Sequence, residues 1–294
     1  MVTSKEIASY LNLELKGADI ELEGFSQLSN IKKNTLVFAK RYSQDSIAAL
    51  NEASSVMAIV APEYDGLLRC PYCISMKPRL DFIKAMDRFF VVKVEEGKIH
   101  PSAVVEEGAL LGQSITIGAH CYVSGQCEIG DGTVLHSNVV LDNKVKIGKH
   151  CEIKSGAVIG QSGFGFEHEG DGKPVHFPHV GGVVIGDNVY IGANTCIDRG
   201  TLGDTVIEND AKIDNLVHIA HNCQVEEGAF VIAGAILGGG THVGKNSWLA
   251  PNVTVKEQTM IHEQALVGLG AVVLKEVEAG AIMVGNPAHK LEKK

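Results

Sequence analysis

An aliphatic residue stands at every sixth position of Ile117-Gly-Ala-His-Cys-Tyr-Val123-Ser-Gly-Gln-Cys-Glu-Ile129-Gly-Asp-Gly-Thr-Val-Leu135. The same period covers residues 99–159, resumes over 185–197 and continues over 207–273. A period of six fits neither a helix, with 3.6 residues per turn, nor a strand that alternates every two residues. It is typical of a solenoid in which each hexad forms one side of a coil, so the sequence predicts a parallel β-helix.

The hexad combines a short strand with a corner. The aliphatic residue is expected to point inward and to stack on its equivalent one coil away, roughly 4.8 Å distant. Three hexads then form a triangular coil of about 18 residues. Gly, Asn or Asp often follows the aliphatic position, as in Ile117-Gly118 and Ile185-Gly-Asp-Asn188, because tight corners need a positive φ or a short hydrogen-bonding side chain. The spacing does not set the hand of the coil, and the general rule for parallel crossovers favours the right hand.

Composition indicates a globular protein. The chain has 294 residues, of which 45% are hydrophobic and 21% charged, and it is long enough for two domains. It holds no apolar run near the roughly 18 residues of a membrane span, and Met1–Glu6 lacks the apolar segment of a signal peptide, so we expect a cytoplasmic protein. A formal net charge of −9 argues against nucleic-acid binding and favours a small-molecule or protein partner.

The cysteine pattern indicates free thiols. The chain has seven cysteines, an odd number, in a context without secretory signals. Five of them lie in the repeats, where a small apolar thiol can fill a core or corner position: Cys121, Cys127, Cys151, Cys196 and Cys223. Cys70-Pro-Tyr-Cys73 has the spacing of a redox motif or of half a zinc site, but no second such pair accompanies it. We therefore expect two ordinary thiols near a turn.

The repeat pattern divides the chain into three segments. Residues 1–98 lack the hexad and mix a helical pattern at 43–52 with a strand pattern at 55–61, which predicts a small α/β domain for nucleotide recognition. Residues 99–275 form the predicted β-helix, and residues 276–294 a tail. Because the end coils of a solenoid expose unpaired strand edges, both flanking segments are also expected to act as caps.

Two interruptions of the repeat are candidate functional segments. The first runs from Gly160 to about Val184 and contains Gly163-Phe-Gly-Phe166 and three histidines, His168, His176 and His179. The second adds four residues between Ile197 and Ile207. An inserted loop must leave the coil and project over a neighbouring surface, although tolerated surface insertions remain the alternative.

The stretch Lys212-Ile-Asp-Asn-Leu-Val-His-Ile-Ala-His-Asn222 holds the candidate base. His221 lies two places after the inward Ile219, which predicts an exposed corner position. An imidazole titrates near neutral pH and can take the proton that an amine loses when it attacks a thioester. Gly239, in Gly238-Gly-Gly240, lies eighteen residues after His221, one nominal coil higher, where a backbone N–H can approach an acyl carbonyl. We therefore predict His221 as the general base and Gly239 as the oxyanion donor.

These motifs, together with Phe177-Pro-His-Val-Gly-Gly-Val-Val-Ile-Gly-Asp187 and Ile191-Gly-Ala-Asn-Thr-Cys-Ile-Asp-Arg-Gly200, resemble the UDP-3-O-acylglucosamine N-acyltransferases of lipid A synthesis. That family belongs to the hexapeptide-repeat acyltransferases. The resemblance implies a left-handed β-helix and a homotrimer with each active site between neighbouring solenoids. It also implies that His221 matches the base and Gly239 the oxyanion donor, and that no cofactor is bound permanently.

Three features depart from that family. By an ungapped count, the second histidine of the relatives falls on or near Glu257. The relatives also place a Phe and a Tyr six residues apart around uracil, whereas Phe38 and Tyr42 are four apart here. The relatives end in a helix that engages acyl carrier protein, for which this chain, ending at Lys294, has no room. The ending Val267–Ala288 instead looks like hexapeptide acetyltransferases that use coenzyme A, so a short acyl-CoA is the expected donor.

The predicted function is an N-acyltransferase that moves an acyl group from acyl-CoA to the amine of a nucleotide-linked amino sugar, for surface glycan or lipopolysaccharide synthesis. The predicted substrate-binding residues are Phe38, Tyr42, Asp214, Asn215 and His218. The predicted donor-binding residues are Gly238, Gly239 and Lys256. His218 either orients the sugar or is a solvated corner residue, and Asp214 either orients a histidine of a neighbouring subunit or forms a corner hydrogen bond.

Two alternatives remain at this point. The first is the lipid A enzyme itself, acting on UDP-3-O-acylglucosamine with an acyl-carrier-protein donor. The second is a metalloenzyme like the γ-type carbonic anhydrases, in which His218 and His221 would contribute to a metal site between subunits.

Overall fold

The computed structural model describes residues 1–92 and 97–291. The chain divides into two compact units, Met1–Val94 and Glu95–Lys294, close to the boundary predicted at residue 98. None of the helices in the described part of the chain has the length and apolar character that crossing a bilayer requires.

The first unit is an α/β domain around a five-stranded sheet of order β2-β7-β6-β5-β4. In the sheet, β2 alone runs antiparallel to its neighbour. The sheet strands are β2 (Leu15–Lys16), β4 (Gly24–Phe25), β5 (Thr35–Ala39), β6 (Val56–Val60) and β7 (Tyr72–Ile74). A separate antiparallel pair consists of β1 (Val2–Thr3) and β3 (Glu21–Leu22). The helices are α1 (Ser4–Leu11), α2 (Gln44–Glu52), α3 (Pro78–Phe89) and the short 3-10 helix η1 (Pro62–Tyr64).

Local sequence explains the elements of this unit. The helix α2 begins after Ser43, whose hydroxyl accepts the N–H of Ser46 and so caps the helix. The helix predicted at 43–52 and the strand predicted at 55–61 are confirmed by α2 and β6. Neighbouring residues of a strand point to opposite faces, so Leu36 and Val37 belong to two different apolar clusters. The sheet is therefore covered on both faces.

Cys70 and Cys73 are buried in this unit. Burial raises the pKa of each thiol to about 11, so both remain protonated near neutral pH. Of the five cysteines in the repeats, four are buried as expected, whereas Cys196 is exposed because it points outward from its strand. A buried pair of neutral thiols has the properties expected of ordinary structural cysteines.

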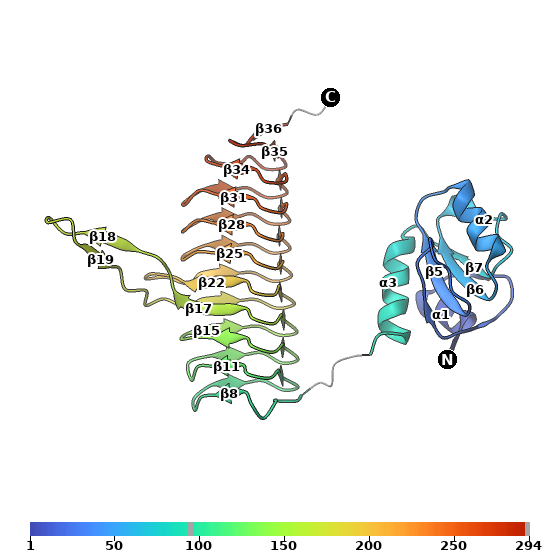
Figure 1. The fold of residues 1–294 in the computed structure, drawn as a ribbon, viewed down its shortest axis with the longest axis horizontal. Coiled ribbons are helices and arrows are strands. Elements are labelled where there is room, and N and C mark those ends of the chain that lie inside the picture. Colours follow the sequence, from blue (N-terminus) through green and yellow to red (C-terminus); the bar gives the residue numbers. More distant parts are fainter. Residues whose placement is uncertain (93–96, 292–294) are drawn as a thin grey trace. The chain divides into compact units, whose positions relative to one another are not determined.

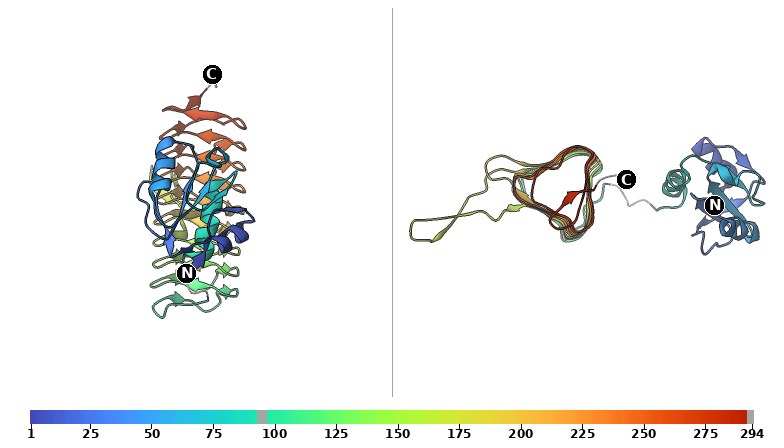
Figure 2. Two further views of the ribbon diagram at one scale, coloured as in Figure 1. Left: turned by 90° about the vertical axis from the view of Figure 1, so that its right-hand side faces the viewer. Right: turned by 90° about the horizontal axis from the view of Figure 1, so that it is seen from above.

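The second unit is a parallel β-helix of triangular cross-section (Figure 1, Figure 2). One side is β8 (Val104–Val105), β11 (Tyr122–Val123), β14 (Val140–Leu141), β17 (Val158–Ser162), β22 (Cys196–Arg199), β25 (His218–Ile219), β28 (Ile236–Leu237), β31 (Thr254–Val255) and β34 (Val272–Val273). The second is β9 (Leu110–Leu111), β12 (Glu128–Ile129), β15 (Val145–Ile147), β20 (Val183–Ile185), β23 (Thr205–Ile207), β26 (Gln224–Val225), β29 (His242–Val243) and β32 (Met260–Ile261). The third is β10 (Thr116–Ile117), β13 (Val134–Leu135), β16 (Glu152–Ile153), β21 (Tyr190–Ile191), β24 (Lys212–Ile213), β27 (Phe230–Val231), β30 (Trp248–Leu249), β33 (Leu266–Val267), β35 (Ile282–Val284) and β36 (His289–Lys290).

The aliphatic residues of the hexads fill the interior of the coil. Leu135 pairs with Ile153 on the next coil, and both are fully buried. Ile99, at the open end of the stack, is 47% exposed because a coil packs on it from one side only. At the other end the parallel stack continues past the predicted limit at residue 275 through β35, on which β36 turns back antiparallel.

The first interruption of the repeat forms a long hairpin that projects from the solenoid, as seen from the side in Figure 1 and from above in Figure 2. We call residues 160–182 the strap. Its outer part is an antiparallel pair, β18 (Phe166–His168) and β19 (Pro174–His176). The strap therefore begins and ends on the coils that carry β17 and β20.

Candidate active site

His221 lies at a corner of the solenoid directly after β25. The strand β25 is hydrogen-bonded to β22 on one side and to β28 on the other, with Ile219 opposite Leu237. The N–H of Gly240 donates to the carbonyl oxygen of His221 at 2.9 Å, which joins the two corners. The base predicted from the sequence and the predicted glycine corner therefore lie on adjacent coils.

Asn222 sets the orientation of the His221 ring. Its side-chain oxygen Oδ1 lies 2.9 Å from His221 Nδ1. Because an amide oxygen only accepts hydrogen bonds, Nδ1 carries the proton and Nε2 keeps its lone pair. Asn222 itself has φ 61°, a left-handed corner conformation that Asn tolerates better than most residues. The ring is therefore held in the tautomer that a general base needs.

The second interruption of the repeat holds Asn222 in place. The N–H and the hydroxyl of Thr201 both donate to Asn222 Oδ1, at 3.1 and 2.9 Å. Asn222 Nδ2 donates to the carbonyl oxygen of Gly203 at 3.3 Å, and the hydroxyl of Thr205 accepts the N–H of Asn222 at 2.9 Å. Three residues of this interruption thus supply the hydrogen bonds that fix the residue beside the base.

Gly239 closely approaches the His221 ring. A Cβ atom at position 239 would lie 2.7 Å from His221 Cε1 and 2.8 Å from Nε2, so only glycine fits there without displacing the ring. Gly238 and Gly240 donate their N–H groups to the carbonyl oxygens of Val255 and His221, whereas the N–H of Gly239 has no acceptor among the described residues. A free N–H beside a base is the arrangement that an oxyanion site requires.

His179 of the strap lies against the base. Its ring is 5.1 Å from the His221 ring, edge to face, and its side chain is 4% exposed. Nδ1 lies 2.8 Å from the carbonyl oxygen of Phe177, while Nε2 is buried without a hydrogen-bond partner among the described residues. Burial lowers the pKa of His179, and the charge of a protonated His221 lowers it further. His179 is therefore a neutral imidazole.

Asp198, on β22, completes the cluster. Its side chain is 14% exposed, and Oδ2 lies 3.8 Å from Nε2 of His218. Burial raises the pKa of Asp198, against the opposing influence of His218, His221 and His179. His218, at 45% side-chain exposure, forms the solvent side of this cluster.

Gly163 of the strap covers these groups with backbone alone. A Cβ atom there would lie 3.0 Å from His179 Nε2, 3.2 Å from Asp198 Oδ2 and 3.2 Å from His221 Cδ2. The three side chains therefore converge on one point beside Gly163.

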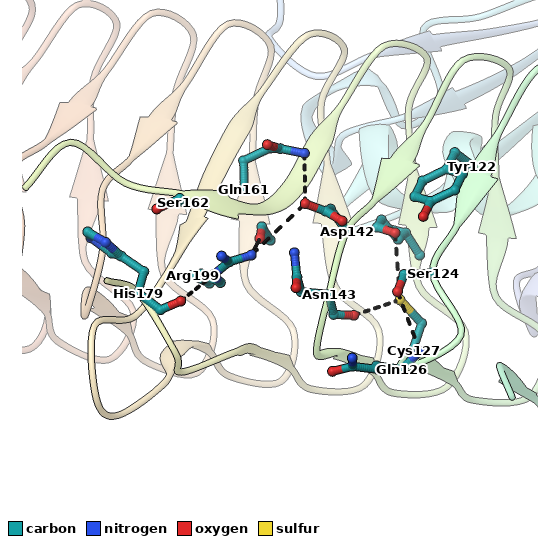
Figure 3. Close-up of polar contacts among 12 residues, drawn as sticks. Tyr122, Ser124, Gln126, Cys127, Asp142, Asn143, Gln161, Ser162, His179 and Arg199 are labelled. Atoms are coloured by element: carbon teal, nitrogen blue, oxygen red, sulfur yellow. Dashed lines mark hydrogen bonds and ion pairs between the residues drawn. The ribbon is translucent and has the colours of Figure 1, made fainter. Parts of the chain in front are cut away.

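Arg199 fastens the strap to the coil (Figure 3). Its Nε donates to the carbonyl oxygen of His179 at 2.8 Å, and Nη1 donates to that of Gly160 at 3.2 Å. Asp142 Oδ2 lies 4.0 Å from Arg199 Nη1 and accepts Gln161 Nε2 at 3.0 Å (Figure 3). One guanidinium group thus binds both ends of the strap. Arginine can do this because its N–H donors form a fixed planar fork.

The remaining predicted residues of the solenoid occupy corners. Asp214 accepts the N–H groups of Asn215 and Ala233, and Asn215 accepts the N–H of Ala193, so both side chains form corner hydrogen bonds. Gly238 lies directly below Glu257, the position of the missing second histidine, since a Cβ atom on Gly238 would lie 2.6 Å from Glu257 N. The exposed Lys256 lies 3.8 Å from the Glu257 carboxylate.

Phe38 and Tyr42 belong to the first unit and have different ring partners. Phe38 packs on Phe82 of α3 at 4.9 Å between ring centres, whereas Tyr42 packs on Tyr64 at 5.7 Å. The structure thus places the two aromatic residues separately rather than as a facing pair.

Three residues of the cluster were not among the predicted site residues. Asn222 directly follows the predicted base at a corner, and that position was the available signal. His179 is one of three histidines in the first interruption, and Asp198 opens the second, but a segment without a period gives no register that would place either beside His221. In residues 1–92 and 97–291, no group of three or more histidine, cysteine, aspartate or glutamate side chains is arranged to hold a metal ion.

Sequence comparison relates the solenoid to known transferases. A family model described as bacterial transferase hexapeptide (six repeats) matches residues 126–161. A UDP-3-O-acylglucosamine N-acyltransferase of Coxiella burnetii is 36% identical over 141 residues, which is 41% of this chain and 41% of the relative. One of Pseudomonas putida is 32% identical over 207 residues, which is 64% of this chain and 58% of the relative. The match thus spans about half the length of these relatives.

Solved structures agree with the fold. A UDP-N-acetylglucosamine O-acyltransferase of Moraxella catarrhalis is 30% identical, with a TM-score of 0.61 over 66% of this chain and 73% of that chain. A UDP-N-acetylglucosamine acyltransferase of Campylobacter jejuni is 28% identical, with a TM-score of 0.61 over 66% and 74%. These neighbours are left-handed β-helices, so the predicted fold and its hand are confirmed.

Proposed function

This chain belongs to the hexapeptide-repeat acyltransferases, and from that premise we propose that it transfers an acyl group from a thioester to the amine of a UDP-linked glucosamine. One observation carries the proposal: the oriented His221 ring lies against Gly239 of the adjacent coil, whose N–H has no acceptor among the described residues. The base and the oxyanion donor of an acyl transfer are therefore present in one place.

The reaction follows from these two groups. Nε2 of His221 takes a proton from the amine as its nitrogen attacks the thioester carbon. The N–H of Gly239 donates to the oxygen that becomes negative in the tetrahedral intermediate. The carbon–sulfur bond then breaks, the amide remains, and the proton held on His221 passes to the leaving thiolate. No acyl-enzyme is needed, because a thioester is already activated and a neutral amine is a competent nucleophile.

The comparisons support the lipid A-type acceptor. The relatives in Coxiella and Pseudomonas are named UDP-3-O-acylglucosamine N-acyltransferases, which favours a uridine-linked glucosamine over other amino sugars. They thus fit the alternative, the lipid A enzyme itself, better than an enzyme for another amino sugar, and they do not identify the acyl donor. We propose this acceptor and carry both donors into the test.

We also propose that the first unit binds the nucleotide. A groove of about 880 Å³ is lined by Phe38, Lys40 and Arg41, among other residues. An aromatic ring can stack on the nucleobase of a nucleotide, and two cationic side chains can bind its phosphates. We further propose that the chain acts as a homotrimer, as the resemblance implies, and that it works in the cytoplasm.

Thiol release tests the function. The purified protein is given acyl-CoA or acylated acyl carrier protein with acyl chains of several lengths, and UDP-3-O-acylglucosamine, UDP-glucosamine or a thymidine-linked amino sugar as acceptor. We expect release that requires both substrates and falls by about a thousandfold in His221→Ala, the scale of a lost general base. His120→Ala, an exposed corner histidine of another coil, is the matched control and should keep full activity. Absence of release with every pair, or equal rates in the two variants, would refute the proposal.

A further inference from the structure

Two imidazoles at the site present lone pairs rather than N–H groups. Nδ1 of His221 is bound to the side-chain oxygen of Asn222, and Nδ1 of His179 to the carbonyl oxygen of Phe177. Neither oxygen can donate, so both protons lie on Nδ1 and both Nε2 atoms are acceptors. The Nε2 atom of His179 is buried without a partner in the described part of the chain, and such an atom is destabilising until a donor reaches it.

A third acceptor lies beside them. Asp198 is largely buried, and its Oδ2 borders the same point beside Gly163 as His179 Nε2 and the His221 ring. We call these three groups, His179 Nε2, Asp198 Oδ2 and His221 Nε2, the acceptor cluster. Its members can receive hydrogen bonds, and the histidines cannot return one from the Nε2 side while their tautomers are held.

We propose that the acceptor cluster selects an amine rather than a hydroxyl as the group to be acylated, with His179 and Asp198 as its specificity-determining residues. The inference rests on the proposed function and deepens it. The neutral amine that attacks has two N–H donors, so it can pair with His221 Nε2 and with one of the other two acceptors, whereas a hydroxyl has one donor and leaves both of the others unpaired. A site built to receive hydrogen bonds discriminates strongly against an analogue that lacks the donors.

The strap provides the access that this contact needs. Gly163 has no side chain, so only its backbone covers His179 Nε2. If the backbone of this one residue moves outward, His179 Nε2 becomes exposed. Gly163 is also followed by the exposed Phe164 and by a second glycine, Gly165, whose absent Cβ would lie 3.1 Å from His179 Cε1. The two residues that flank Phe164, Gly163 and Gly165, therefore cover His179 with backbone atoms alone.

Paired ligands test the proposal by binding alone. UDP-glucosamine and UDP-glucose differ in that the first carries an amine where the second carries a hydroxyl, and calorimetry gives a Kd for each. We expect the native protein to prefer the amine by tenfold or more. His179→Phe keeps a ring without Nε2, and Asp198→Asn replaces one acceptor oxygen by a donor. Each should reduce the preference by about five- to tenfold, the effect of one lost hydrogen bond.

His176→Phe is the matched control, because His176 is an exposed strap histidine stacked on His179 at 5.6 Å between ring centres. It should keep the preference of the native protein. Partial unfolding weakens the apparent binding of both ligands by the same factor, so it does not change the ratio of the two Kd values. An unchanged ratio in both His179→Phe and Asp198→Asn would overturn the inference while leaving acyl transfer intact. A native protein that binds neither ligand and releases no thiol would refute the proposed function itself.

Discussion

His221 and Gly239 show how much of the chemistry depends on single atoms. The imidazole has one free nitrogen, because Asn222 occupies the other, and the glycine has one free N–H, because its neighbours use theirs for the stack. The two groups approach each other so closely that a methyl group does not fit between them. At this scale, the reactivity of the site is set by which hydrogen bonds are already made.

Gly239→Ala should lower kcat by a hundredfold or more. The added Cβ would lie 2.7 Å from His221 Cε1, so the ring must leave the position in which it is oriented. The melting temperature should change little, since the corner keeps its backbone hydrogen bonds. Gly170→Ala is the control, because a Cβ there meets no atom within 4 Å and Gly170 makes no contact with the site, and its activity should equal that of the native protein. Equal activity of both variants would show that the ring does not need this clearance.

The strap is an element whose two ends are joined by one side chain. Arg199 binds the carbonyl oxygens of Gly160 and His179, which are the two places where the strap meets the coil. Beyond them the hairpin of β18 and β19 has exposed apolar side chains and contacts with its own strands. Arg199 therefore links the outer hairpin to the position of His179 beside the base.

Arg199→Lys should loosen the strap without unfolding the solenoid. An ammonium group cannot reproduce the two directed N–H bonds of the guanidinium fork. We expect faster amide hydrogen exchange at residues 160–182, an activity loss of about tenfold, and unchanged exchange in the coils of β27 and β30 as an internal control. Uniform acceleration throughout the solenoid would instead mean that Arg199 stabilises the whole stack.

Periodicity decides which features of the structure can be predicted from the sequence. The coils, the inward aliphatic residues and the corner position of His221 were predictable, because a strict repeat fixes the register of every hexad. The contact of His179 with His221 was not, because the strap has no repeat and its course depends on Arg199. Similarly, the spacing of Phe38 and Tyr42 did not reveal that each ring packs on a different partner.

The solenoid as a whole is stabilised coil by coil. Each strand is hydrogen-bonded to the coil before and the coil after it, so the free energy of unfolding is close to a sum over neighbouring coils. Interior coils have two neighbours and end coils have one. The cost of a cavity should therefore depend on its position along the stack.

Ile153→Ala and Ile99→Ala test this dependence. Ile153 is fully buried between two coils, and its truncation should lower the free energy of unfolding by about 2–4 kcal/mol. Ile99 is 47% exposed at the open end, and the same truncation should lower it by less than about 1 kcal/mol. Denaturant titration of the two variants gives both values. Similar losses at the two positions would contradict the coil-by-coil description.

Acid should weaken contacts between coils in a defined direction. Glu226 accepts hydrogen bonds from His242 and from the N–H of Lys245, and the His242 contact chiefly holds the pKa of this carboxyl below its usual 4.5. A lowered carboxyl pKa adds stability above the unfolded value and loses it as the pH falls through the folded value. The melting temperature of Glu226→Gln should therefore lie below that of the native protein down to about pH 4.5, and the difference should shrink at lower pH. A difference that grows below pH 4.5 would contradict this sign.

The base and the oxyanion donor come from adjacent coils, since Ile219 lies opposite Leu237, eighteen residues later. The catalytic pair is therefore a property of one junction between coils and is independent of how many coils lie above or below it. Duplication or loss of an eighteen-residue unit elsewhere in the gene would change the length of the stack and leave this junction as it is. Families built in this way can evolve in length without losing their chemistry, whereas an insertion out of register within the junction would separate His221 from Gly239.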